Sequence, residues 1–62
     1  MLLVALHLVN GKEIIVNFTT MTHMYAYEEE GYSKQTVIFF SGGNEIRVAE
    51  DYETVKQLIE KG

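Results

Sequence analysis

A chain of 62 residues holds one domain, close to the smallest size at which a single hydrophobic core stabilises a fold. It has no cysteine and two histidines, which excludes a disulfide framework and leaves no obvious set of structural zinc ligands. Nine acidic residues against five basic ones give a net charge of −4, and an acidic surface repels phosphate, so we expect no nucleic acid partner.

The first two elements are predicted as a β-hairpin. Residues 2–9 are rich in Leu and Val, and residues 12–18 are rich in Ile and Val. Asn10-Gly11 lies between them and favours a two-residue type I′ turn, which requires positive φ angles. Such a turn places His7 opposite Ile14 and leaves the first strand apolar on both faces. That pattern predicts a strand that is covered on both sides.

The middle of the chain is predicted as a third strand that ends in an acidic loop. Residues 19–27 favour extended structure through their Thr, Met and Tyr content, after a short turn near residues 18–20. Glu28, Glu29 and Glu30 end the strand because three adjacent carboxylates prefer solvent. We interpret this run either as a solvated loop or as an acidic finger that engages a basic partner in a salt-sensitive contact.

The second hairpin joins residues 36–40 to residues 45–49 through Gly42-Gly43. A two-residue turn there places Phe39 opposite Ile46, and we expect this face to belong to the core. Ile38 and Phe40 then lie on a mixed opposite face, which needs a partner or a covering element.

The end of the chain is predicted as an amphipathic helix. Asp51 can cap its first turn by accepting main-chain N–H bonds. The apolar residues that follow fall on one stripe, which can dock on a sheet; they are Tyr52, Val55, Leu58 and Ile59. The sequence therefore predicts a β-rich α+β domain over residues 1–62. We expect an antiparallel meander of four to five strands, as a twisted sheet or small open barrel, with one C-terminal helix.

Catalysis and metal binding find little support in the sequence. Ser33 and Ser41 lie in predicted turns with no recognisable base nearby. His7 and His23, with Glu13 as a third ligand, form no dedicated metal motif. We therefore expect no enzyme activity, no metal and no cofactor.

A protein partner is expected because one helix cannot cover both faces of so apolar a sheet. The predicted function is a small interaction module that self-associates, and exposed strand edges favour such pairing. The candidate interface residues are Leu6, Leu8, Ile38 and Phe40. The alternative is an acidic inhibitor of phage or mobile-element origin that uses Glu28, Glu29 and Glu30 to bind a DNA-handling host protein. The absence of cysteine fits the cytoplasm, and the apolar first residues are too few for a membrane span.

The chain also resembles a known family. The residues that carry the resemblance span roughly residues 5 to 60 and are Asn10-Gly11-Lys12-Glu13, Val16-Asn17, Thr36-Val37-Ile38, Gly43, Ile46, Val48, Glu50, Glu53, Val55 and Ile59. This arrangement is similar to the FlbD-like small flagellar proteins, which include SwrD. The resemblance implies a cytoplasmic, non-enzymatic accessory protein linked to motility. The family pattern lacks the acidic, Tyr-containing segment of residues 28–35, and it contributes no catalytic residues.

Overall fold

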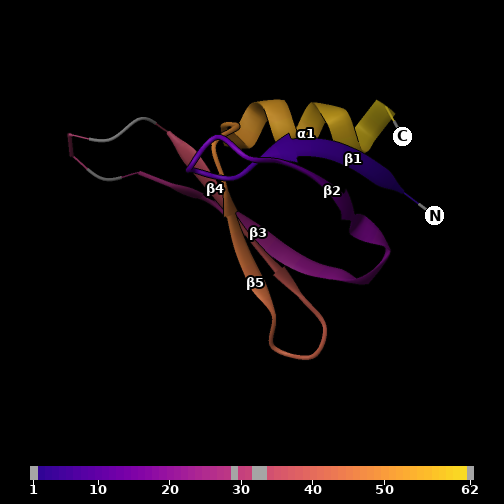
Figure 1. Cartoon of the computed structure of the whole chain (residues 1–62). Helices are drawn as coiled ribbons and strands as arrows, with labels where there is room; N and C mark the ends of the chain where they lie inside the picture. The colour runs from indigo at the N-terminus through magenta and orange to yellow at the C-terminus, as the bar shows by residue number, and fades with distance from the viewer. Residues whose placement is uncertain (1, 29, 32–33, 62) are drawn as a thin grey trace.

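The computed structural model describes residues 2–28, 30–31 and 34–61, and over this range it confirms a β-rich α+β fold with one C-terminal helix (Figure 1). No helix within these ranges is long and apolar enough to cross a membrane. The elements in chain order are β1 (Leu3–His7), β2 (Glu13–Asn17), the 3-10 turn η1 (Phe18–Thr20), β3 (Met21–Tyr27), β4 (Gln35–Phe40), β5 (Glu45–Val48) and α1 (Tyr52–Lys61).

The strands form two antiparallel sheets that meet at one corner. β1 pairs with β2, and the second sheet has the order β3-β4-β5. A single bridge between Leu8 and Val48 brings the end of β1 beside the end of β5. There the Ala49 N–H donates to the His7 carbonyl oxygen at 2.7 Å. The helix α1 lies across the strands on the side where β1 runs (Figure 1).

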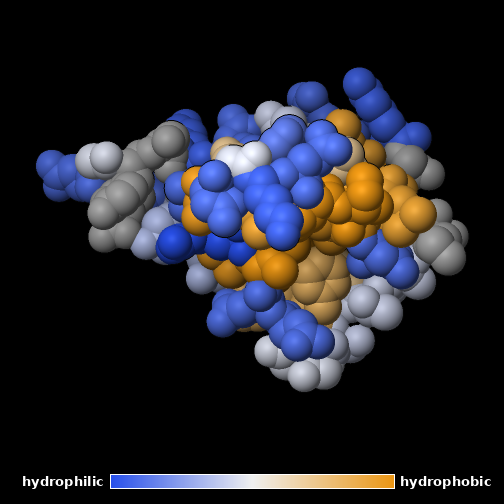
Figure 2. Space-filling view, in the orientation of Figure 1, coloured by the Kyte–Doolittle hydropathy of each residue, from blue (hydrophilic) through white to orange (hydrophobic). Residues whose placement is uncertain are grey.

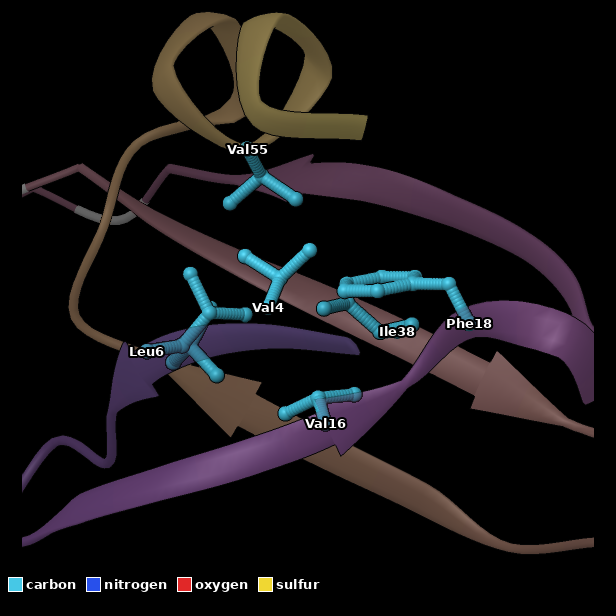
Figure 3. Packing of buried hydrophobic residues seen from close by; sticks show 7 residues of the cluster. Val4, Leu6, Val16, Phe18, Ile38 and Val55 are labelled. Atoms are coloured by element: carbon cyan, nitrogen blue, oxygen red, sulfur yellow. The ribbon is translucent and has the colours of Figure 1, made fainter. Parts of the chain in front are cut away.

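The core lies between the two sheets and the helix. Figure 3 shows side chains from β1, β2, η1, β4 and α1 converging on one space. Leu6, Ile38 and Val55 are fully buried there, which indicates that all three layers contribute to the same cluster. The buried members of the cluster are Val4, Leu6, Val16, Phe18, Ile38, Val48 and Val55.

The predicted type I′ turn of the first hairpin is wrong, because the loop has three residues. The Leu8 N–H donates to the Lys12 carbonyl oxygen at 2.8 Å, so residues 9–11 form the loop. Gly11 has a φ of 91°, whereas no residue other than glycine has a positive φ among the described residues. Asn10 instead accepts the Lys12 N–H with its side chain at 3.0 Å. A type I turn followed by a left-handed glycine is the common three-residue alternative.

The longer loop shifts the strand register by one residue in both hairpins. His7 faces Glu13 instead of the predicted Ile14, and Ile46 faces Ile38 instead of the predicted Phe39. In the second hairpin the Phe40 N–H donates to the Asn44 carbonyl oxygen at 2.8 Å, which again leaves three residues in the loop. A one-residue shift moves a strand's side chains to the opposite face relative to its partner.

The shift also determines which face of the first hairpin is covered. Val16 and Ile14 now lie beside Val4 and Leu6 and pack in or against the core. The opposite face is exposed, with Ile15 at 63%. The prediction that the first strand is covered on both sides is therefore wrong.

The helix begins as the sequence predicts. The Asp51 carboxylate accepts the Thr54 N–H at 2.9 Å, which is the geometry of an N-cap. Val55 is completely buried, while Leu58 and Ile59 are partly buried against the core. This contact places the apolar stripe of α1 on the strands.

Candidate interaction surface

Two of the predicted interface residues cannot make contacts with a partner. Leu6 and Ile38 are 0% exposed and belong to the core, so the prediction is wrong for them. The one-residue shift explains the error: Ile38 faces apolar Ile46, and Leu6 faces apolar Ile14. Phe40 is partly buried against the core, with its ring centroid 6.3 Å from that of Phe18.

The rim of the core reaches the surface beneath α1. Figure 2 shows hydrophobic residues gathered there, on the side of the molecule seen in Figure 1. Phe40 belongs to a set of partly buried hydrophobic residues around the core, so it remains accessible at its outer edge. The set comprises Leu2, Ile14, Met21, Met24, Phe40, Ile46, Leu58 and Ile59. Leu8, the fourth predicted interface residue, is also partly buried.

A second surface lies on the outer side of the three-stranded sheet. Odd-numbered residues of β3, β4 and β5 face each other across the strands, since Tyr25 pairs with Val37 and Val37 with Arg47. Side chains alternate along a strand, so all of these residues share the face that points away from the core. We call this surface the aromatic face, and it comprises His23, Tyr25, Tyr27, Gln35, Val37, Phe39, Glu45 and Arg47.

The rings of the aromatic face are held against each other. The His23 and Phe39 rings stack with centroids 4.4 Å apart and planes 12° apart. The Tyr25 ring also stacks against Phe39, with centroids 5.8 Å apart and planes 29° apart. The Arg47 guanidinium carbon lies 4.9 Å from the centre of the Tyr27 ring. These contacts fix the side chains before any partner arrives, which reduces the entropy lost on binding.

The aromatic face is exposed only in part: His23, Tyr25, Glu45 and Arg47 are exposed, Tyr27 and Phe39 are half-buried, and Val37 is buried. Tyr25 is 48% exposed, and Val9 from the first hairpin loop is 45% exposed beside it. A hollow of about 490 Å³ separates that loop from the sheet. Among the described residues its lining contains one basic side chain, Arg47, and one acidic side chain, Glu45. The full lining comprises Leu8, Val9, Asn10, Tyr25, Tyr27, Val37, Glu45, Ile46 and Arg47.

The predicted acidic loop is only partly within the described residues. Glu28 and Glu30 are exposed, as predicted for a solvated run, and Glu29 lies outside the described residues. Glu28 also borders a second hollow of about 500 Å³ beside the start of α1, together with Asp51 and Glu53. Hydrogen bonds from Thr54 lower the pKa of Asp51 below its ordinary value, and Lys34 adds to this effect. Within the described ranges no three His, Cys, Asp or Glu side chains are placed to hold a metal ion.

Glu50 connects the two sheets, a role that no local sequence pattern indicated. Its carboxylate accepts the main-chain N–H of His7 at 2.9 Å and 3.1 Å, and it lies 2.9 Å from the His7 ring Nδ1. Its carbonyl oxygen accepts the hydroxyl of buried Thr36 at 2.9 Å. His7 and Glu50 are 43 residues apart in the chain, so no local pattern could reveal their contact.

The contact between His7 and Glu50 changes how both groups titrate. The hydrogen bond to Glu50 raises the pKa of His7 above 6.5, although burial lowers it. The negative charges of Glu50 and Glu13 raise this pKa further. Burial raises the pKa of Glu50, but the hydrogen bonds from His7 outweigh it and leave this pKa below 4.5. His7 therefore forms a structural pair with a carboxylate of the β5–α1 connection, while His23 lies in the other sheet.

Comparisons of the chain with protein-family models, with curated proteins and with solved structures found no match. Tyr and Arg are enriched at the centres of protein interfaces. Platforms that stack nucleic acid bases need a basic groove beside the rings, whereas Arg47 is accompanied here by Glu45. The aromatic face is thus better suited to a protein.

Proposed function

We propose that this protein is a small, non-enzymatic interaction module that self-associates through a contact centred on the aromatic face. The observation that carries the proposal is Tyr25, which is 48% exposed yet stacked on Phe39 in an ordered row of rings. Rigid aromatic side chains bury a large area on association and lose little side-chain entropy. The resemblance to FlbD-like proteins supports a non-enzymatic accessory role in the cytoplasm.

A second copy is the partner that best fits this face. Arg47 and Glu45 lie on it at alternate positions of β5, so the face carries one charge of each sign and does not repel a second copy of itself. A small domain also gains stability from association, since its own core comprises few residues. Both observations favour self-association over contact with an unrelated surface.

Sedimentation equilibrium of the wild-type chain and two variants tests the proposal. Tyr25→Ser removes an exposed ring from the aromatic face, and we expect association to weaken at least tenfold, about the effect of a central interface residue. Ile15→Ser is the matched control, because it removes a more exposed hydrophobic residue from the other sheet. A wild-type chain that stays monomeric at millimolar concentration contradicts the proposal, as does equal weakening by both variants.

A second function is favoured by the acidic end of the molecule. Glu28 and Glu30 are exposed, and the hollow beside α1 is bordered by Glu28, Asp51 and Glu53. These carboxylates support an acidic inhibitor of a DNA-handling protein, which binds through a basic surface. Replacement of Glu28, Glu29 and Glu30 by Gln should then abolish salt-sensitive binding to such a protein, and binding that survives this change excludes the acidic loop as the contact.

A further inference from the structure

The strand β3 forms one edge of its sheet and directs main-chain groups away from it. The Phe40 N–H points toward β5, where it donates to the Asn44 carbonyl oxygen. The main-chain groups of successive residues point to opposite sides of a strand, so those of Val37 and Phe39 point toward β3. Their partners in β3 are Tyr25 and His23. The residues between these bonded positions, Met24 and Ala26, therefore point their N–H and C=O groups outward. No other element hydrogen-bonds to these outward groups within the described ranges.

Over residues 23–27 this edge lacks the features that usually prevent edge-to-edge pairing. Natural edge strands carry charged residues or proline, or they are short or interrupted by bulges. β3 is seven residues long, contains no Lys, Arg, Asp or Glu, and the whole chain has no proline. Its one irregularity lies between Met21 and His23, which leaves residues 23–27 regular. By contrast, β2 carries Glu13, and β5 carries Glu45 and Arg47.

We propose that two copies of this chain pair through β3 as antiparallel strands, with the two-fold axis at Tyr25. This inference rests on the proposed function, since it states how the self-association occurs. The axis at Tyr25 places Met24 opposite Ala26 of the second copy, so the outward groups of these two residues meet in a hydrogen-bonded pair. The two three-stranded sheets then become one six-stranded sheet whose aromatic faces are continuous.

Side chains on the joined face are compatible with a second copy. Tyr25 meets its own counterpart, and His23 meets Tyr27 of the second copy, so the new cross-strand pairs are aromatic. Such pairs stabilise antiparallel sheets. Although each chain carries a charge of −4, residues 23–27 contain no carboxylate, so this register places no two carboxylates of the paired strands opposite each other. A second copy therefore fits both the main-chain pattern and the charges of β3.

Disulfide trapping tests the axis directly, because the natural chain has no cysteine. In the proposed dimer Tyr25 forms a non-hydrogen-bonded pair with its counterpart, where Cα atoms lie about 4.5 Å apart, and this separation allows a disulfide. Under mild oxidation, Tyr25→Cys should form a covalent dimer at least tenfold faster than the control Ile15→Cys, which is 63% exposed on the other sheet. Equal rates for the two variants overturn the proposed axis.

A second pair of variants keeps Tyr25 intact. Ala26→Pro removes an outward N–H and adds no charge, a change that edge strands tolerate on their solvent side. Ala26→Ser is the control that retains this N–H. We expect Ala26→Pro to weaken dimerisation at least tenfold with an unchanged circular dichroism spectrum, and Ala26→Ser to match the wild type. A wild-type dimer that both variants leave intact overturns the edge pairing but not the self-association, whereas a monomeric wild type contradicts the proposed function itself.

Discussion

Loss of the Glu50 carboxylate should destabilise the fold, because this group ties β1 to the β5–α1 connection. Each of its two oxygens accepts from His7 at about 3 Å, and its side chain is only 19% exposed. Hydrogen bonds to charged groups contribute about 1.5–3 kcal/mol. The His7 side chain is 49% exposed and can bind water when the carboxylate is removed. We therefore expect Glu50→Ala to lower the free energy of unfolding by about 1.5 kcal/mol, the lower end of this range.

This cost is measurable by thermal unfolding. In a domain of this size one kcal/mol corresponds to roughly 4–8 °C in Tm, so Glu50→Ala should lower Tm by roughly 6–12 °C. Glu13→Gln is the matched control, since its carboxylate also faces His7 but lies 3.8 Å away and is 66% exposed. We expect the control to shift Tm by no more than about 2 °C, as is usual for exposed ion pairs. Equal shifts in the two variants would refute the role of Glu50.

The pH dependence of this effect follows from the two pKa values. His7 has a raised pKa, so its stabilisation is complete below pH 6.5 and is lost as pH rises through the raised value. Glu50 has a lowered pKa, so its stabilisation is complete above pH 4.5 and is lost as pH falls through the lowered value. The Tm difference between wild type and Glu50→Gln should therefore be largest between these two values. A difference that is constant from pH 5 to pH 9 would show that the pair does not titrate as described.

Variants at three further positions test the fold. Leu6→Ala leaves a cavity at a fully buried position and should lower the free energy of unfolding in urea by about 2–5 kcal/mol. A decrease below about 1 kcal/mol would place Leu6 outside the core. Gly11→Ala introduces a Cβ that meets no atom within 4 Å, so its expected cost of about 1–2 kcal/mol comes from the φ of 91° alone. An unchanged Tm would contradict that loop geometry. Asp51→Ala removes the helix cap and should cost about 1 kcal/mol, which circular dichroism melting can detect, whereas Asp51→Asn should retain most of the stability.

The sequence predicted the positions of the strands and the helix better than the register in which the strands pair. Asn10-Gly11 and Gly42-Gly43 correctly located the hairpins, and Asp51 correctly located the helix start, because these signals are local. The residue types alone leave the length of each loop open, since glycine with a positive φ fits both a two-residue turn and a three-residue loop. That difference of one residue exchanged the faces of the strands and moved Leu6 and Ile38 from the predicted interface into the core.

The parts of the surface that sequence reasoning missed depend on long-range contacts. The ring stack of His23 on Phe39 forms only when β3 and β4 pair in the observed register. The alternation of Tyr25 and Tyr27 along a predicted strand was visible, yet alternation alone does not show which face the rest of the chain covers. The contact of His7 with Glu50 joins opposite ends of the chain.

Amide NMR spectra recorded on dilution of the wild-type chain from millimolar to micromolar concentration test the central claim most directly. If the chain self-associates at the aromatic face, the amide resonances of His23, Tyr25 and Ala26 shift with concentration, while that of Ile15 stays in place. Resonances that are identical throughout the dilution series, together with the rotational correlation time of a 7.1 kDa protomer, would show that the isolated protomer is the stable species and would contradict self-association.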